Sequence, residues 1–136
     1  MPQTRPNRTL GPRHDEFWAG CANGELRLQR CAACGVVAWP VTSACEECGS
    51  PDLRFETLSG RGTLTSWCTF HYDYYRGVLP LPHDTVLVEL EEGPQFISNP
   101  FNLDPKDMKV GMPVKVNFID CEDAGGVFRL PVFERA

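Results

Sequence analysis

The chain has 136 residues, a hydrophobic fraction of 42% and a formal net charge of -5 at pH 7. This length suffices for one ordinary domain or two very small ones, and the hydrophobic fraction is typical of a folded protein. The acidity argues against a protein that tracks phosphate backbones, because such proteins usually carry a basic face.

The first segment, residues 1–13, shows neither a helical nor a strand period and contains Pro2, Pro6 and Pro12. We therefore expect a flexible N-terminal arm over residues 1–14. No apolar run reaches the roughly 18 residues that a membrane-spanning helix needs, and the start of the chain lacks the apolar core of a secretory signal. These features predict a cytoplasmic protein without a membrane partner.

A short helix is predicted from Asp15 onward. Phe17, Trp18 and Cys21 fall on one helical face, and Gly24 is suited to end the helix. Two large aromatic side chains on so short a helix need a surface that buries them. This surface is either the protein's own core or a groove of a partner, and the sequence does not decide between them. Phe17 and Trp18 are therefore candidate contact residues.

Two CxxCG units lie within residues 25–58. Residues 25–30 and 36–39 read as strands, which places the first unit at the tip of a hairpin. Two residues between sulfur atoms let one tight turn direct both thiolates at a single ion, and four thiolates fill a tetrahedral shell. We therefore expect a structural zinc ion, with iron as the alternative for the same geometry, bound by Cys31, Cys34, Cys45 and Cys48.

The remainder, residues 59–136, reads as a small all-β domain. Short runs with a period of two are separated by glycine and proline signals, which favours a five-stranded barrel of the oligonucleotide/oligosaccharide-binding (OB) type. The fold class is therefore mainly β, with a short helix and zinc ribbon over 15–58 and an OB-fold barrel over 59–136. The predicted strands cover residues 63–72, 85–90, 95–98, 114–119 and 127–133.

A long insertion separates the first two barrel strands, at residues 71–84. Loops of this length in compact domains are uncommon unless they bind something, and tyrosine and arginine are enriched at binding hot spots. The candidate partner or ligand contacts in this loop are Tyr72, Tyr74, Tyr75 and Arg76.

The sequence does not place a nucleophilic side chain where it could meet a general base. Cys68 and His71 lie three positions apart on a predicted strand and therefore point to opposite faces. We expect Cys68 to be buried and structural, and His71 to lie at the surface. Other cysteines and histidines are expected to be packing thiols or solvated loop side chains, namely Cys21, Cys121, His14 and His83.

The order of these parts resembles the thiolase-associated zinc-ribbon plus OB-fold proteins. The resemblance covers residues 15–135 and is carried by EFWAGCANGELRLQRCAACG, CEECGS, SGRGTLTSW, VLVELEEG, VGMPVKV and LPVFE. It implies a helical segment, a rubredoxin-like zinc ribbon and a C-terminal OB barrel. Of the family's functional residues, only the four zinc cysteines carry over to this sequence.

The resemblance also implies a function. The chain would be a non-catalytic accessory subunit of a thiolase-superfamily protein that cleaves carbon–carbon bonds of aromatic, steroid or fatty acyl-CoAs by thiolysis or a retro-aldol reaction. It would stabilise that partner and help form the channel in which the complex binds the CoA thioester. An alternative remains open, a single-stranded nucleic-acid-binding module in which Trp67 stacks on bases, although the acidity argues against it.

Overall fold

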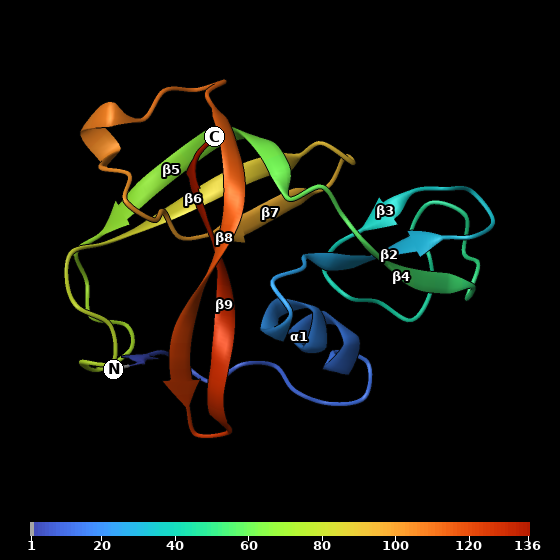
Figure 1. Cartoon of the computed structure of the whole chain (residues 1–136), viewed down its shortest axis with the longest axis horizontal. Coiled ribbons are helices and arrows are strands. Elements are labelled where there is room, and N and C mark those ends of the chain that lie inside the picture. Colours follow the sequence, from blue (N-terminus) through green and yellow to red (C-terminus); the bar gives the residue numbers. More distant parts are fainter. Residues whose placement is uncertain (1) are drawn as a thin grey trace.

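Two β-sheets and one short helix make up the described chain, residues 2–136 of a computed structural model (Figure 1). A six-stranded sheet occupies the left of Figure 1 and a three-stranded sheet the right, with helix α1 near the place where they meet. The prediction of a mainly β fold with a short helix is confirmed. None of the helices in the described residues is long and apolar enough to cross a membrane.

Helix α1, Asp15–Ala22, carries its aromatic pair as the sequence predicts. The helix ends where the Gly24 backbone N–H donates to the Cys21 carbonyl, with Gly24 at a positive φ of 73°. Phe17 is only 3% exposed and belongs to the protein's own core. Trp18 is half-buried, and its indole N–H donates to the Thr9 carbonyl at 3.1 Å. The protein itself therefore supplies most of the surface that the pair needs.

The three-stranded sheet has the order β3–β2–β4 and is antiparallel throughout. Its strands are β2, Arg27–Cys31, β3, Val37–Ala38, and β4, Leu53–Thr57. The β2–β3 hairpin confirms the prediction that the first CxxCG unit lies at a hairpin tip. Strand β4 was not predicted, because only its first and third residues are apolar and so short an alternation is a weak signal.

The five OB strands follow in the predicted order along the chain. They pair as β7–β6–β5–β8–β9, and the polar connection between β7 and β8 holds the short 3₁₀ helix η1, Pro105–Asp107. The strands are β5, Arg61–Phe70, β6, His83–Leu90, β7, Gln95–Ser98, β8, Pro113–Asp123, and β9, Gly126–Arg135.

The expected barrel is not closed by a continuous ladder. Beyond β7, the chain meets β9 in a single parallel bridge between Pro100 and Phe133. Two backbone hydrogen bonds support the bridge, from Phe101 N–H to the Phe133 carbonyl at 2.8 Å and from Phe133 N–H to the Asn99 carbonyl at 3.0 Å. Strand β7 is only four residues long, and Pro100 has no N–H to extend the pairing. The five-stranded OB sheet is therefore curled but open at this seam.

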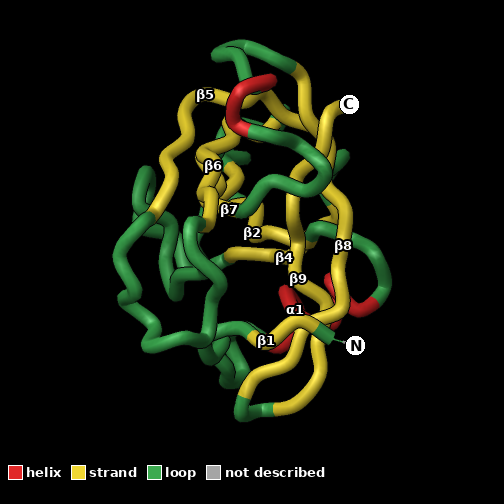
Figure 2. The backbone as a smooth tube through the Cα atoms, turned by 90° about the vertical axis from the view of Figure 1, so that its left-hand side faces the viewer, coloured by secondary structure: helices red, strands yellow, loops and turns green. Residues whose placement is uncertain are grey.

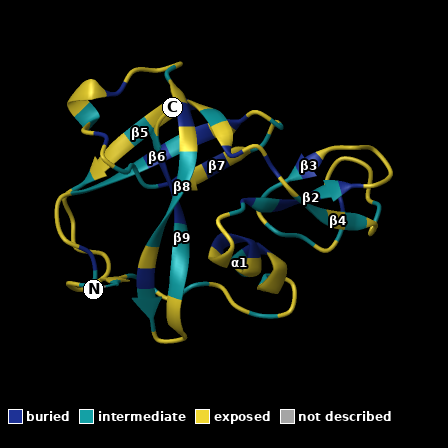
Figure 3. Ribbon diagram, in the orientation of Figure 1, coloured by how far each residue is buried: buried dark blue, intermediate teal, exposed yellow. Residues whose placement is uncertain are grey.

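One hydrophobic core joins the two sheets and the helix (Figure 3). It includes Phe17 of α1, Leu28 of β2, Val37 of β3, and Phe96 and Phe133 of the larger sheet. Small domains bury too little apolar surface to be stable alone, so a three-stranded ribbon gains from sharing the core of its neighbour.

The N-terminal arm is docked, where the sequence led us to expect a flexible segment. Strand β1, Gln3–Thr4, pairs with β8 in parallel, and Figure 2 shows it beside the lower part of that strand. Farther along, the Arg8 guanidinium forms an ion pair with Asp123 at 2.8 Å and lies 4.2 Å from the centre of the Phe128 ring. A two-residue strand and a side-chain clasp leave no periodicity in the sequence, so pattern analysis does not detect them.

The Arg8–Asp123 clasp has a defined pH dependence. Hydrogen bonds from the Arg8 side chain hold the pKa of Asp123 well below its ordinary value of 3.8. A carboxyl group with a lowered pKa stabilises the folded state above its unfolded pKa, and this contribution is lost as the pH falls through the folded value. The clasp should therefore be complete at neutral pH and should weaken only as the pH falls below the ordinary pKa of an aspartate.

Replacing Arg8 with glutamine should release the arm. We expect amide hydrogens of residues 2–14 to exchange severalfold faster at pH 7 than in the wild type, because the ion pair and the cation–aromatic contact are both lost. Arg13→Gln is the matched control, since Arg13 belongs to the same arm and forms no ion pair within residues 2–136. Equal exchange in the two variants would contradict the clasp.

Candidate metal centre and aromatic cavity

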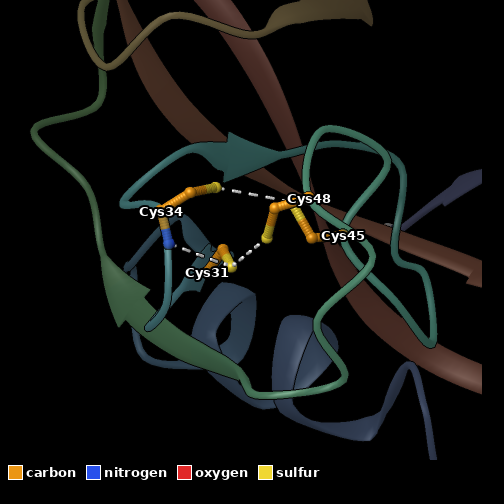
Figure 4. Close-up of side chains that lie close together, drawn as sticks. All are labelled: Cys31, Cys34, Cys45 and Cys48. Atoms are coloured by element: carbon orange, nitrogen blue, oxygen red, sulfur yellow. Dashed lines mark hydrogen bonds between the residues drawn. The ribbon is translucent and has the colours of Figure 1, made fainter.

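Four cysteine sulfur atoms converge in the ribbon (Figure 4). Their Sγ atoms all lie within 4.8 Å of one another. The Cys31 and Cys48 sulfurs are 3.5 Å apart, and the Cys34 and Cys45 sulfurs 3.6 Å. A tetrahedral ion with bonds of about 2.3 Å to sulfur holds its ligands about 3.8 Å apart. The four positions therefore fit one zinc ion with little adjustment.

The two CxxCG units have the same local geometry. In each, the glycine N–H donates to the carbonyl of the first cysteine at 2.8 Å, from Gly35 to Cys31 and from Gly49 to Cys45. Both glycines have a positive φ, 82° and 78°, which a residue with a side chain rarely adopts. This turn directs both cysteines of a unit to the same point, and it explains why glycine follows each pair.

The thiols of this cluster differ in their pKa values. The Cys34 backbone N–H is the main cause of the low pKa of Cys31, about 6. The Val36 backbone N–H lowers the pKa of Cys34, but burial and hydrogen bonds with neighbouring sulfurs outweigh it and raise that pKa to about 12. An ion that binds here must displace the remaining protons. Because the protein would supply all four ligands, such an ion is structural and has no position left for a substrate.

The remaining cysteines divide into buried and exposed thiols. Cys21 and Cys121 are fully buried, as expected of packing residues, and burial raises the pKa of Cys21 to about 12. Cys68 was expected to be buried, but it is exposed. The register of β5 shifts between Leu64 and Ser66, so the side chains after this bulge change faces. Trp67 consequently packs against the core and is only partly exposed.

The histidine predictions need one correction. His83 was expected in a solvated loop, but it begins β6 and stacks on Phe70 with ring centres 5.1 Å apart. His14 lies at the N-cap of α1 and is partly buried. His71 is exposed, as predicted. Both His14 and His83 line a cavity that the sequence did not reveal.

This aromatic cavity has a volume of about 780 Å³. It is bounded by the N-terminal arm, α1, the ribbon segment after β3, the 71–82 loop, and strands β5, β6, β7 and β9. Phe17, Trp18, Trp39 and Phe96 form one aromatic group of its lining, and Phe70, Tyr74 and Tyr75 form another. Segments from every part of the chain therefore contribute to one cavity.

Four of the six predicted contact residues line the aromatic cavity. These are Phe17, Trp18, Tyr74 and Tyr75, whereas Tyr72 and Arg76 lie on the exposed outer part of the loop. No pattern in the sequence pointed to three further lining residues, because Arg5 lies in the arm, Trp39 in the ribbon and Phe96 in a core strand. Only the folded chain brings them together.

Two family models match the chain in succession. The model described as ChsH2, rubredoxin-like zinc ribbon domain matches residues 18–54, and the model described as ChsH2, C-terminal OB-fold domain matches residues 55–118. These matches agree with the two sheets of the structure and confirm both predicted domain types.

Curated relatives carry the names of enzyme subunits and of scaffold proteins. A probable enoyl-CoA hydratase alpha subunit of Thermomonospora curvata is 31% identical over 97% of this chain, and a 3-oxo-4,17-pregnadiene-20-carboxyl-CoA hydratase alpha subunit of Mycobacterium tuberculosis is 36% identical over 79%. The chain spans only 40% and 34% of these two proteins. A DUF35 domain-containing scaffold protein of Pyrococcus furiosus is 29% identical, with 60% of each chain covered.

A solved structure entitled Ltp2-ChsH2(DUF35) aldolase is similar over nearly the whole chain. The match has a TM-score of 0.80 and 27% sequence identity, and it covers 95% of this chain and 98% of the other.

Proposed function

Because the chain belongs to the ChsH2/DUF35 family of zinc-ribbon and OB-fold proteins, we propose that it is a non-catalytic accessory subunit of an acyl-CoA enzyme complex. Its partner would be a thiolase-superfamily protein that cleaves a carbon–carbon bond of an acyl-CoA. The chain would stabilise this partner and contribute to its substrate channel.

The similarity to the ChsH2(DUF35) aldolase structure carries the proposal. It extends over 95% of this chain and 98% of the other, so it includes the ribbon, the helix and the OB sheet together. A chain that matches one component of a named aldolase along its full length is suited to the same kind of assembly. Two relatives are named as hydratase subunits, and this chain covers less than half of each. A hydratase-type partner is therefore the alternative, and the experiment must distinguish it from a thiolase-superfamily partner.

The metal centre supports an accessory role. Its four cysteines leave no ligand position for substrate, so a bound ion would hold the ribbon rigid without activating a substrate. Acyl transfer requires a nucleophile with an adjacent base, and in the proposed complex the partner would supply both.

The surface around the cavity mouth supports contact with a protein. Ile97 of β7 is 69% exposed, and the 71–82 loop presents Tyr72 and Tyr74 at 68% and 65% exposure, followed by Arg76. Ile97 and Tyr74 both border the aromatic cavity, so apolar surface continues from the cavity onto the outer face. Interface hot spots are enriched in tyrosine and arginine. A partner seated on this surface would share the cavity and complete a channel for the acyl-CoA.

Native mass spectrometry tests the assembly. The chain would be co-expressed with the thiolase-superfamily protein and with the hydratase encoded nearest to it, each in a separate experiment. We expect a stable complex with the first protein, and the double variant Tyr72→Ala/Tyr74→Ala should weaken it at least tenfold, as loss of hot-spot residues does. Val127→Ala is the control, because Val127 is 73% exposed but does not line the cavity.

If the chain formed a complex with the hydratase and not with the thiolase-superfamily protein, a hydratase would be its partner. Absence of any complex, together with salt-sensitive binding of single-stranded DNA or RNA in fluorescence anisotropy, would favour the nucleic-acid alternative.

A further inference from the structure

We propose that the aromatic cavity is a ligand site within this single chain, which binds an apolar ring-containing group and holds the carbonyl or carboxylate oxygen of that group against the Arg5 guanidinium. This inference deepens the proposed function, and it rests on that function only for the source of the ligand. The binding itself requires no partner, so it is open to a separate test.

The size and lining of the cavity suit a small organic ligand. A volume of about 780 Å³ lies within the range of roughly 300–1,000 Å³ that is typical of such sites. Phe17 and Phe96 each lie with ring centres 4.8 Å from that of Trp39, tilted by 34° and 36°. Phe17 and Phe96 are almost completely buried and support the partly exposed Trp39, on which a flat ring system gains both buried area and stacking contact.

A second aromatic group lines the cavity from β5, β6 and the loop. Phe70 and His83 are stacked, with an interplanar angle of 18°, and Tyr74 meets Phe70 edge-on at 6.3 Å. The contact between Tyr74 and Phe70 holds the 71–82 loop against β5. Leu79 of the same loop is buried, with 6% of its surface exposed. The lining is therefore built on ordered elements on both sides.

Arg5 is the one arginine or lysine among the described residues that line the cavity. Its backbone N–H donates to the Glu122 carbonyl at 2.9 Å, which continues the pairing of β1 with β8, and its Nη2 donates to Asn99 Oδ1 at 2.9 Å. Among residues 2–136, no carboxylate lies within ion-pair distance of this guanidinium, in contrast to that of Arg8. Burial lowers the pKa of Arg5, because the partly buried guanidinium has lost hydration.

A partly desolvated cation without a counter-ion favours a ligand oxygen with negative charge. Charge-assisted hydrogen bonds from a guanidinium to a carboxylate are among the strongest in proteins. An apolar ring system with one oxygen-bearing end therefore matches both the aromatic lining and the Arg5 guanidinium.

Isothermal titration calorimetry on the purified full-length chain tests this site. The probes are 2-naphthoate, 2-naphthoyl-CoA and 2-naphthylmethanol, which share a fused ring and differ in the oxygen-bearing group. Arg5→Gln should weaken 2-naphthoate binding about tenfold, the loss expected for a hydrogen bond to a charged group, and should leave 2-naphthylmethanol binding unchanged. Arg13→Gln, in the same arm but outside the cavity, should bind all three as the wild type does.

A second pair of variants tests the location. Thr85 lines the cavity and Val127 does not, so Thr85→Trp should abolish binding of every probe, and Val127→Trp should not. Binding of 2-naphthoyl-CoA much more tightly than 2-naphthoate would identify the ligand as an acyl thioester, and the reverse order would identify a free acid.

Two results would overturn the inference. One is that no probe binds at millimolar concentration, as expected if the cavity is filled only by side chains of a partner protein. The other is that Arg5→Gln weakens the carboxylate and the alcohol equally. Probe binding by a chain that forms no complex with an acyl-CoA enzyme would refute the proposed function and leave this site intact.

Discussion

Replacing Cys48 with serine should abolish stoichiometric zinc binding and unfold the ribbon. The Cys48 sulfur lies 3.5 Å from that of Cys31 within the four-cysteine cluster, so its loss opens the tetrahedral shell. Binding of a structural zinc ion contributes about 10–16 kcal/mol at neutral pH in small zinc domains, which exceeds the stability of most whole domains. The three short strands of the ribbon do not compensate for such a loss.

Metal analysis and hydrogen exchange measure this effect together. We expect about one zinc per chain in the wild type and far less in Cys48→Ser, with amide protection lost in β2, β3 and β4. Protection in β8 and β9 should be retained in part, because that hairpin has ten paired positions of its own. Cys68→Ser is the matched control, since Cys68 is exposed and lies outside the cluster. A fully protected ribbon in a zinc-free Cys48→Ser protein would contradict a structural role for the ion.

Replacing Phe133 with alanine should cost about 3–5 kcal/mol of unfolding free energy, the usual effect of removing a buried aromatic side chain. Phe133 is 1% exposed and meets Phe96 edge-on with ring centres 6.0 Å apart. It also occupies the one bridge where the two edges of the open OB sheet meet. Truncation therefore leaves a cavity at the open seam of the OB sheet.

Urea denaturation of the zinc-loaded protein gives the free energy directly. Val127→Ala serves as the control, because Val127 is 73% exposed near the start of β9 and should change the stability by no more than about 0.5 kcal/mol. If Phe133→Ala were as stable as that control, the core would not depend on the seam between β7 and β9.

Much of the fold follows from local patterns in the sequence. The alternation in the five OB runs and the glycine after each cysteine pair are consequences of backbone geometry, so they are visible without the structure. The metal cluster was predictable for the same reason, because CxxCG spacing directs two sulfur atoms at one point. The helix was predictable from Phe17, Trp18 and Cys21 on one face.

Features that depend on contacts between distant segments were not predictable. The bulge at Thr65 exposes Cys68, and no periodic signal marks the change of face. Strand β1 pairs with a strand more than a hundred residues away, and the sequence contains no local trace of this pairing. The aromatic cavity is the extreme case, since Arg5, Trp39 and Phe96 have no common motif and meet only when the arm, the ribbon and the OB sheet are assembled.

A turnover assay tests the accessory role most directly. An acyl-CoA substrate of the proposed thiolase-superfamily partner would be incubated with the zinc-loaded chain alone, the partner alone and the reconstituted complex, and carbon–carbon cleavage would be followed by chromatography. We expect no turnover by the chain alone, and a higher kcat/KM for the complex than for the partner alone. Cleavage of the thioester by the isolated chain, or a partner whose kcat/KM is the same with and without it, would contradict the proposed role.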